Sequence, residues 1–256
     1  MKTIVIANQK GGVGKTTTSA MLAMGLARAG HRVLAVDADA QGNLGMYLGA
    51  EEDGHATLSA LLEAELNGTD LSPAPLPNAH GVDVLMADRS LFALERRLEE
   101  ESTALRSALS RYEGAYDYAV IDTGPHLGPM LTAVLLAADR VIIPVEPELF
   151  AASGLDALLQ TIAGIRRVNR NLSVAGLLIA RVDSRSAEHQ RIGSALRKQY
   201  SGSVHVYEQP VPLSEKVREA ARKAKSPFEY SPRSYATRAY NKLVQEVLAD
   251  EIKRGG

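Results

Sequence analysis

"TIVIANQKGGVGKTTTSAMLAMGLARAG", residues Thr3–Gly30, predicts a strand, a glycine-rich loop and a helix in direct succession. Thr3–Asn8 is a short apolar run with β-branched residues, which is typical of a buried strand. Lys15–Ala29 reads as a helix, and Gly30 stands where a glycine commonly ends one. Between them, three glycines allow the backbone to bend so that its N–H groups converge on an anion. The succession therefore predicts a phosphate-binding loop at a helix N-terminus.

The loop also has the residue types that nucleotide phosphates require. Lys15 supplies a positive charge for the β- and γ-phosphates, and the Thr16 hydroxyl suits Mg²⁺. The pattern G-x-x-x-x-G-K-[ST] fails only at its first position, where Gln9 replaces glycine. A glycine-rich turn without function is the alternative, but the strand before, the helix after and the Lys-Thr pair in register argue against it. Lys10, at the front of the loop, is a second lysine that phosphate binding alone does not need.

Strand and helix patterns alternate along the rest of the chain. Apolar runs typical of buried parallel strands cover Arg32–Asp39, Val82–Ala87, Tyr118–Asp122, Arg140–Val145, Val174–Val182 and Val204–Tyr207. Helical patterns cover Leu91–Tyr112, Ser153–Val168 and Ala187–Tyr200. The proline-containing stretch Ala50–Gly81 predicts a surface loop with a short helix at Leu58–Leu66. The alternation predicts an α/β fold, a doubly wound, mainly parallel sheet flanked by helices, in a single domain over residues 1–256.

Carboxylates end two of the predicted strands. Asp37 and Asp39 end one strand, and Asp122 ends another. Because the C-terminal ends of parallel strands form the ligand crevice of an open α/β sheet, these side chains are expected near the phosphate loop. A carboxylate there holds a metal through water or orients the water that attacks the γ-phosphate. A lone Asp at a strand end can merely cap the next helix, but three of them favour a metal and phosphate site.

The composition excludes several classes of protein. With 45% hydrophobic and 23% charged residues the chain is typical of a soluble globular protein. Because the chain has no cysteine, disulfides, iron–sulfur ligation and thiolate zinc sites are excluded. The N-terminus lacks a signal-peptide pattern and no apolar run approaches the length of a membrane span. We therefore expect a cytoplasmic protein.

The net charge of -1 conceals an asymmetry along the chain. From Glu51 to Tyr112 there are twelve acidic and five basic residues, a net charge of about -7. From Arg181 to Lys225 there are ten basic and five acidic residues, a net charge of about +5. A basic third of the chain can bind a polyanion through its surface. For any single residue, a scattered solvated charge is the alternative.

Several segments carry a family resemblance. "KGGVGKTTT", with its leading lysine, resembles a deviant Walker A motif; "DADAQGN" resembles the switch D-x-D-P-Q-G-N; and "YDYAVIDTGPHLG" resembles the matching Walker B region. "VIIPVEPELFAASGLDALLQTI" and "EYSPRSYATRAYNKL" resemble the later segments of the same proteins. The family is that of the ParA/MinD ATPases with a deviant Walker A motif, and within it the ParA partition proteins. The resemblance covers nearly the whole chain and implies a P-loop NTPase fold.

The resemblance implies an ATP and Mg²⁺ site whose residues fall at matching positions. Lys10 would reach across an ATP-dependent homodimer to the partner's phosphates, so that hydrolysis is coupled to dimerisation. Asp39 would position the hydrolytic water, and Asp122 would act on the metal through water. The implied catalytic set is Lys10, Lys15, Asp39 and Asp122, and the implied metal set is Thr16, Asp39 and Asp122. The nucleotide would be held by Lys10, Gly11, Gly12, Val13, Gly14, Lys15, Thr16 and Thr17, with its adenine against Gln209, Pro210, Val211 and Pro212 on the loop Gln209–Leu213.

The chain departs from the family pattern near the site. Gly124, Pro125 and His126 replace the usual Pro-Pro-Ser after the Walker B Asp, and Ala40 replaces the switch proline. His126 as a catalytic base is a hypothesis that we weigh below the alternative of an ordinary loop histidine, because the family needs no such base.

ParA proteins bind DNA without sequence preference through basic residues, and the resemblance implies the same here. Arg185, in "VDSRS", falls at the position of a DNA-contacting arginine, and "KVREAARKAK" predicts a basic helix over Lys216–Lys225. A solvated helix face is the alternative. A ParB-like centromere-binding partner, a location on the nucleoid, and a chromosome or plasmid as cargo are further implications. The hypothetical DNA surface comprises Arg185, Lys216, Arg218, Arg222 and Lys223.

The alternative function is that of a MinD-like positioning ATPase on a membrane. That function needs a C-terminal amphipathic helix with bulky apolar residues facing the lipid. The tail "YNKLVQEVLADEIKRGG" has apolar residues but also three acidic residues and no Phe or Trp. We therefore expect it to pack on its own domain, without stable membrane association.

Overall fold

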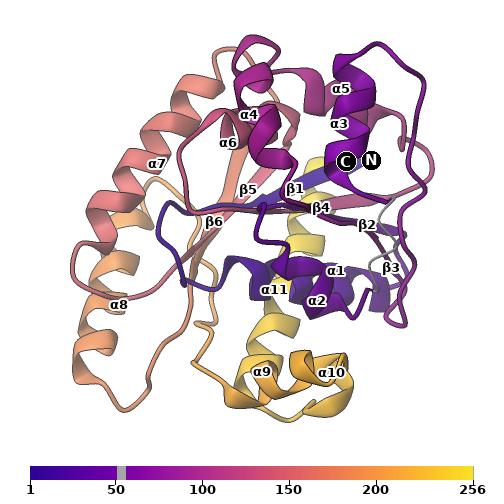
Figure 1. Cartoon of the computed structure of the whole chain (residues 1–256). Coiled ribbons are helices and arrows are strands. Elements are labelled where there is room, and N and C mark those ends of the chain that lie inside the picture. Colours follow the sequence, from indigo (N-terminus) through magenta and orange to yellow (C-terminus); the bar gives the residue numbers. More distant parts are fainter. Residues whose placement is uncertain (51–55, 256) are drawn as a thin grey trace.

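Six parallel strands form one sheet through the middle of the molecule, in the order β3-β2-β4-β1-β5-β6 (Figure 1). The structure is a computed structural model that describes residues 1–50 and 56–255. All five neighbouring strand pairs are parallel, which confirms the predicted doubly wound fold. The strands are β1 (Lys2–Ile6), β2 (Val33–Ala38), β3 (Val82–Leu85), β4 (Tyr118–Thr123), β5 (Arg140–Val145) and β6 (Ser173–Ile179).

Helices cover both faces of the sheet (Figure 1). One face packs against α3 (Leu58–Leu66), α4 (Leu91–Glu100), α5 (Ala104–Ser110), α6 (Pro129–Ala137), α7 (Ala151–Ile165) and α8 (Ala187–Tyr200). The other packs against α1 (Lys15–Arg28), α2 (Asn43–Leu48), α9 (Glu215–Arg222), α10 (Pro227–Tyr230) and α11 (Tyr235–Gly255). None of the helices in the described part of the chain is both long and apolar enough to cross a membrane.

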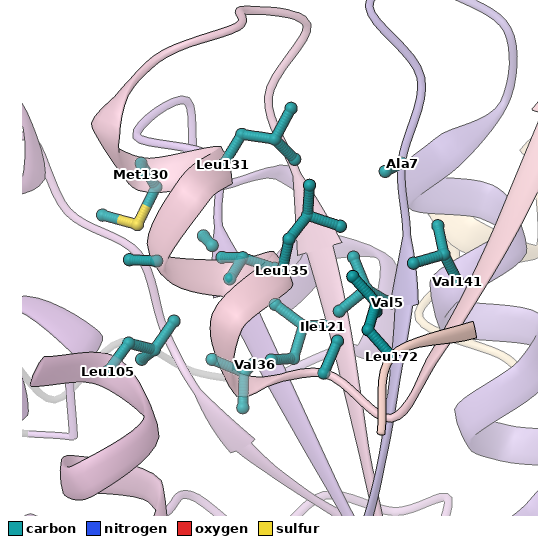
Figure 2. Packing of buried hydrophobic residues seen from close by; sticks show 14 of the residues in the cluster. Val5, Ala7, Val36, Leu105, Ile121, Met130, Leu131, Leu135, Val141 and Leu172 are labelled. Carbon is teal, nitrogen blue, oxygen red and sulfur yellow. The ribbon is translucent and has the colours of Figure 1, made fainter. Parts of the chain in front are cut away.

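Each strand contributes to two hydrophobic cores because neighbouring side chains point to opposite faces. Val5 of β1 lies in the core under α6, whereas Ile4 and Ile6 lie in the core under α1. Figure 2 shows the first core, in which Ile121 of β4 lies below Leu135 of α6. Burial on both faces explains why the strands read as nearly continuous apolar runs.

The structure corrects the predicted helix over Leu91–Tyr112, which is divided into α4 and α5. The break falls at Glu101–Thr103, where Glu101 adopts φ -119° and ψ 58°. Ser102 and Thr103 favour such a break because their hydroxyls compete with the backbone for hydrogen bonds.

The predicted strand Val204–Tyr207 is also corrected, since it forms a single bridge between Val206 and Leu177. Tyr207 N donates to Leu177 O at 3.0 Å, but the next bond to β6 comes from Val211 N to Ile179 O at 2.8 Å. The residues between them include Pro210, which has no N–H to donate, so the ladder is interrupted.

Several predicted boundaries are confirmed. The helices over Leu58–Leu66 and Ala187–Tyr200 have the predicted ends. Gly30 follows α1 with φ +94°, the left-handed conformation expected of a glycine that ends a helix. Of the predicted surface loop Ala50–Gly81, residues 51–55 lie outside the described residues.

Candidate nucleotide site

The glycine-rich loop leaves β1 and turns directly into α1. Gly12 and Gly14 have φ of +77° and +93°, so both positions need the conformational freedom of glycine. Gly14 is the N-cap of α1 and provides no side-chain hydrogen bond to the first turn. The free N–H groups of that turn and the helix dipole are therefore available to an anion.

Lys15 is the cation inside this loop. Its side chain is buried, and Nζ donates a hydrogen bond to the carbonyl oxygen of Lys10 at 3.0 Å. Burial lowers the pKa of Lys15, while the negative charges of Asp122 and Asp39 act in the opposite direction. The ammonium group thus lies against the phosphate loop and feels the negative charge of two carboxylates.

Asp37 and Asp122 lie side by side on β2 and β4, and both are fully buried. Asp37 accepts hydrogen bonds from Asp39 N at 3.1 Å and Leu44 N at 2.9 Å. Burial raises the pKa of Asp37 to about 8, and the neighbouring charge of Asp122 adds to this effect. Because both its oxygens accept backbone bonds, Asp37 shapes the turn into α2.

Asp122 has an oxygen left for another ligand. Its Oδ1 accepts a hydrogen bond from Ser19 Oγ at 2.9 Å. Its Oδ2 is buried and accepts no hydrogen bond of good geometry from the described residues. Burial raises the pKa of Asp122 to about 6. The hydroxyls of Thr16 and Ser19 and the positive charge of Lys15 lower this pKa, but by less. An unpartnered buried carboxylate oxygen beside a threonine hydroxyl fits a hard cation such as Mg²⁺.

No cluster of three or more His, Asp or Glu residues that could hold a metal occurs among residues 1–50 and 56–255. A Mg²⁺ ion needs few protein ligands, because it keeps several waters and takes further oxygens from phosphates. Thr16, Asp39 and Asp122 are the residues that would hold such an ion. Asp39 is half-buried and accepts a hydrogen bond from Gln41 N at 3.1 Å.

A cavity of about 420 Å³ opens beside the loop. Gly11, Gly12, Gly14 and Lys15 to Thr17 form one side, and Val211, Pro212 and Leu213 form part of the other. This arrangement brings together most of the residues predicted for the nucleotide, from two parts of the chain. Five of the predicted site residues do not line the cavity, and two of these are buried (Val13 and Asp122); the other three are Lys10, Gln209 and Pro210.

Sequence reasoning missed several residues of the wall. Tyr47 of α2 accepts a hydrogen bond from Thr17 Oγ1 at 3.0 Å. Tyr240 of α11 lies 3.2 Å from Thr18 Oγ1 through its hydroxyl. No local pattern marks Tyr240, because only the packing of α11 on α1 brings it to the cavity. Met46, Arg181 and Arg218 also line the cavity.

Lys10 extends away from the cavity. Its Nζ forms an ion pair with Glu148 on the loop between β5 and α7, and both side chains are nearly half exposed. Its backbone N–H donates to Asn8 Oδ1 at 2.9 Å. Within one chain, therefore, Lys10 meets a carboxylate at the surface.

The predicted DNA residues lie at the surface but are paired with acidic residues. The side chain of Arg185 is 90% exposed, and its Nε lies 3.3 Å from Asp183. On α9, Glu219 pairs with Lys216 and Lys223, and Glu215 pairs with Arg218 and Arg222. Arg218 also lines the nucleotide cavity, so it differs from the other four.

His126 lies near Asp39 at the surface. It is exposed, and with Asp39 and Phe92 it lines a second, small cavity of about 50 Å³. Its role as a catalytic base stays a hypothesis.

Comparisons with known proteins agree with this geometry. A family model described as AAA domain matches residues 1–174. The chromosome partitioning protein ParA of Caulobacter vibrioides is 35% identical over 262 residues, covering 99% of this chain and 96% of that protein. The sporulation initiation inhibitor protein Soj of Bacillus subtilis is 35% identical over 254 residues, covering 97% of this chain and 99% of that protein.

Solved structures with bound nucleotide have the same fold. Cobyrinic acid a,c-diamide synthase from Mycobacterium smegmatis, with bound ADP and magnesium, matches with a TM-score of 0.82 and 29% identity. The alignment covers 100% of this chain and 97% of that one. The septum site-determining protein MinD from Pyrococcus horikoshii, complexed with Mg-ADP, matches with a TM-score of 0.75 and 25% identity, covering 96% and 95%.

Proposed function

Because the chain belongs to the ParA/MinD family of ATPases, we propose that it is a partition ATPase with one ATPase domain over residues 1–256. It binds ATP with Mg²⁺, dimerises, binds DNA without sequence preference and hydrolyses ATP to segregate a chromosome or plasmid. A ParB-like centromere-binding protein stimulates it, and it works in the cytoplasm on the nucleoid. The arrangement of Lys15, Asp39 and Asp122 around the glycine loop and its cavity is the observation that carries the proposal.

In this proposal each side chain has a defined task. The loop N–H groups and Lys15 bind the β- and γ-phosphates, which leaves the γ-phosphoryl group near Asp39. Asp39 orients the attacking water. Thr16, Asp39 and Asp122 would hold Mg²⁺, which would neutralise phosphate charge. Val211 and Pro212 lie against the adenine, whereas Gln209 and Pro210 of the same loop do not line the cavity.

The basic surface of Arg185, Lys216, Arg218, Arg222 and Lys223 binds DNA through phosphate charge. Because Arg218 lines the nucleotide cavity, reversal of its charge would disturb two functions at once. Charge reversal at Arg185 and Lys216 is the cleaner test, and it should abolish DNA retention while sparing ATP-dependent dimerisation. Retention equal to that of the unmodified protein would contradict the proposed surface.

A MinD-like membrane function is the second candidate, favoured by the match to the MinD structure. A lipid-binding tail needs a free apolar face, yet Leu243, Val244 and Val247 of α11 are buried in the core under α1. Flotation with anionic lipid vesicles distinguishes the two candidates. The partition ATPase should stay with the unbound protein at the bottom of the gradient in ATP and in ADP.

The central experiment measures ATP turnover with Mg²⁺, with and without nonspecific DNA. We expect slow basal hydrolysis that DNA alters and that removal of Mg²⁺ with EDTA abolishes. A protein that neither dimerises with ATP nor responds to DNA would contradict the partition function.

Replacement of Lys10 tests the coupling of hydrolysis to dimerisation. Lys10→Ala should leave ATP binding largely intact, because Lys10 lies outside the cavity wall. Dimerisation with ATP should be lost, and turnover should fall by about a hundredfold, since a positioned charge at the transferring phosphate is missing. Lys198→Ala, which removes an exposed lysine from α8, is the matched control. Normal hydrolysis by a monomeric Lys10→Ala protein would refute this role.

A further inference from the structure

Arg181 follows β6 in an unusual backbone conformation. Its φ is +58°, in the left-handed region that residues with a side chain rarely adopt. Strained residues of this kind persist where the surrounding structure holds them, and they cluster at ligand sites. Arg181 lines the nucleotide cavity, so the strain occurs at a position where a ligand would lie.

The side chain of Arg181 lies over the phosphate loop. Its Cγ and Cδ are each 3.7 Å from the point that a Cβ atom would occupy on Gly14. Its Nε donates a hydrogen bond to Glu146 Oε1 at 3.2 Å. The Glu146 side chain is only 12% exposed, whereas that of Arg181 is 32% exposed. Glu146, the more buried partner, therefore holds the guanidinium group at the cavity.

The other two nitrogens of the guanidinium group are available. Among the residues described, Nη1 and Nη2 of Arg181 make no hydrogen bond. A guanidinium group has five N–H donors, and in this geometry only the one on Nε is used. The free pair has the geometry that binds two oxygens of a phosphate or a carboxylate.

The neighbours of Arg181 define which part of a nucleotide it meets. Val182 N donates to Val211 O at 3.1 Å, and Leu213 N donates to Val182 O at 3.0 Å. Arg181 thus lies where the segment expected at the adenine meets the phosphate loop. The loop and Lys15 hold the β- and γ-phosphates, so the part of the nucleotide between the loop and the adenine segment is the ribose and the α-phosphate.

We propose that Arg181 is a nucleotide-binding residue that contacts the α-phosphate and ribose, positioned by Glu146. The inference rests on the proposed ATP site and adds to it a contact that the phosphate-loop motif does not contain. ADP and ATP share the contacted groups, so the contribution of Arg181 is the same for both. A contact to the γ-phosphate would instead affect ATP alone, and a purely structural ion pair would affect neither.

The test measures the dissociation constants of ADP and of a non-hydrolysable ATP analogue, each with Mg²⁺. Arg181→Met keeps the apolar stem and removes the guanidinium group, and it should weaken both nucleotides alike, by about tenfold. Arg181→Gly relieves the backbone strain but leaves the nearly buried Glu146 unpaired, and it should weaken both nucleotides as much. Arg170→Met, which removes an exposed arginine beyond α7, should change neither affinity.

The possible results distinguish the role of Arg181 from the proposed ATP site itself. Unchanged ADP affinity in both Arg181 variants would overturn the proposal, as would a loss confined to the ATP analogue. If the unmodified protein binds neither nucleotide, the proposed function fails first. If it binds both and the Arg181 variants bind equally well, only the role of Arg181 fails. Glu146→Gln should weaken both nucleotides less than Arg181→Met does, because it leaves the guanidinium group in place but less firmly oriented.

Discussion

At the scale of single residues, the ion pair between Lys10 and Glu148 determines whether Lys10 is available to a second protomer. Lys10 is predicted to reach the phosphates of a second protomer, but within one chain its Nζ is paired with Glu148. An exposed pair of this kind is worth at most about 1 kcal/mol. Hydrogen bonding and the charge of Lys10 lower the pKa of Glu148, so the carboxylate is ionised near neutral pH. Glu148 therefore competes for Lys10 under the conditions in which the dimer would form.

Glu148→Gln removes this competition. It should lower the ATP concentration needed for dimerisation by up to about fivefold, the equivalent of an exposed ion pair. Sedimentation velocity over an ATP titration measures the change. Because Lys10→Ala by itself removes dimerisation, the matched control is Glu188→Gln, which removes an exposed carboxylate from α8 and should leave that ATP concentration unchanged. Weaker dimerisation of Glu148→Gln would show that Glu148 acts across the dimer instead.

At the scale of elements, α9 combines four cations, including its C-cap Lys223, with two carboxylates that pair with all four. Hydrogen bonds from Tyr230, Lys223 and Lys216 lower the pKa of Glu219 to about 2. A lowered pKa means that these contacts are present at neutral pH and are lost only as the pH falls from the ordinary range of a glutamate towards 2. Near neutral pH the cations of α9 are therefore partly neutralised.

Glu219→Gln frees Lys216 and Lys223 together. We expect tighter retention on nonspecific DNA and a steeper fall of affinity with salt, by about one unit in the log–log slope. Fluorescence anisotropy at several salt concentrations measures both. Glu229→Gln, on the neighbouring α10, removes an exposed carboxylate without an ion pair among those described and is the matched control. An unchanged slope would show that α9 does not belong to the proposed DNA surface.

At the scale of the whole molecule, the packing of α11 on α1 joins the two ends of the chain. Gly25 of α1 faces Val244 of α11, and a Cβ atom at Gly25 would lie 2.4 Å from Val244 Cγ2. Lys2 Nζ lies 3.7 Å from Glu251 Oε2, so the start of β1 and the C-terminal part of α11 are also in contact. The close approach of the helices carries Tyr240 to the nucleotide cavity.

Gly25→Ala should therefore destabilise the protein, although alanine favours helix. The overpacking cost of about 1–3 kcal/mol exceeds the gain in helix propensity. Urea unfolding measures the free energy. Gly164→Ala, in α7 with nothing within 4 Å of its Cβ position, should stabilise the protein by about 0.5–1 kcal/mol. Equal effects of the two substitutions would contradict this account of the helix contact.

The sequence predicts those features of the fold and the site that are determined by residues adjacent in the chain. The phosphate loop, the parallel strands and the carboxylates at their ends are local patterns, and the structure has them at the expected places. Tyr240 and Arg181 were not recognised as parts of the cavity, because tertiary packing alone brings them to it. The single bridge at Val206 escaped prediction for a related reason, since an apolar run does not reveal how many of its N–H groups find a partner.

One consequence follows from the position of α9. The helix lines the nucleotide cavity through Val217 and Arg218, and it exposes Lys216 and Arg222 to the proposed DNA surface. The coupling free energy between two ligands of one protein is reciprocal. Any factor by which nucleotide changes the affinity for DNA is also the factor by which DNA changes the affinity for nucleotide. On a dense nucleoid, the protein would then hold its nucleotide with an affinity different from that of the same protein free in solution.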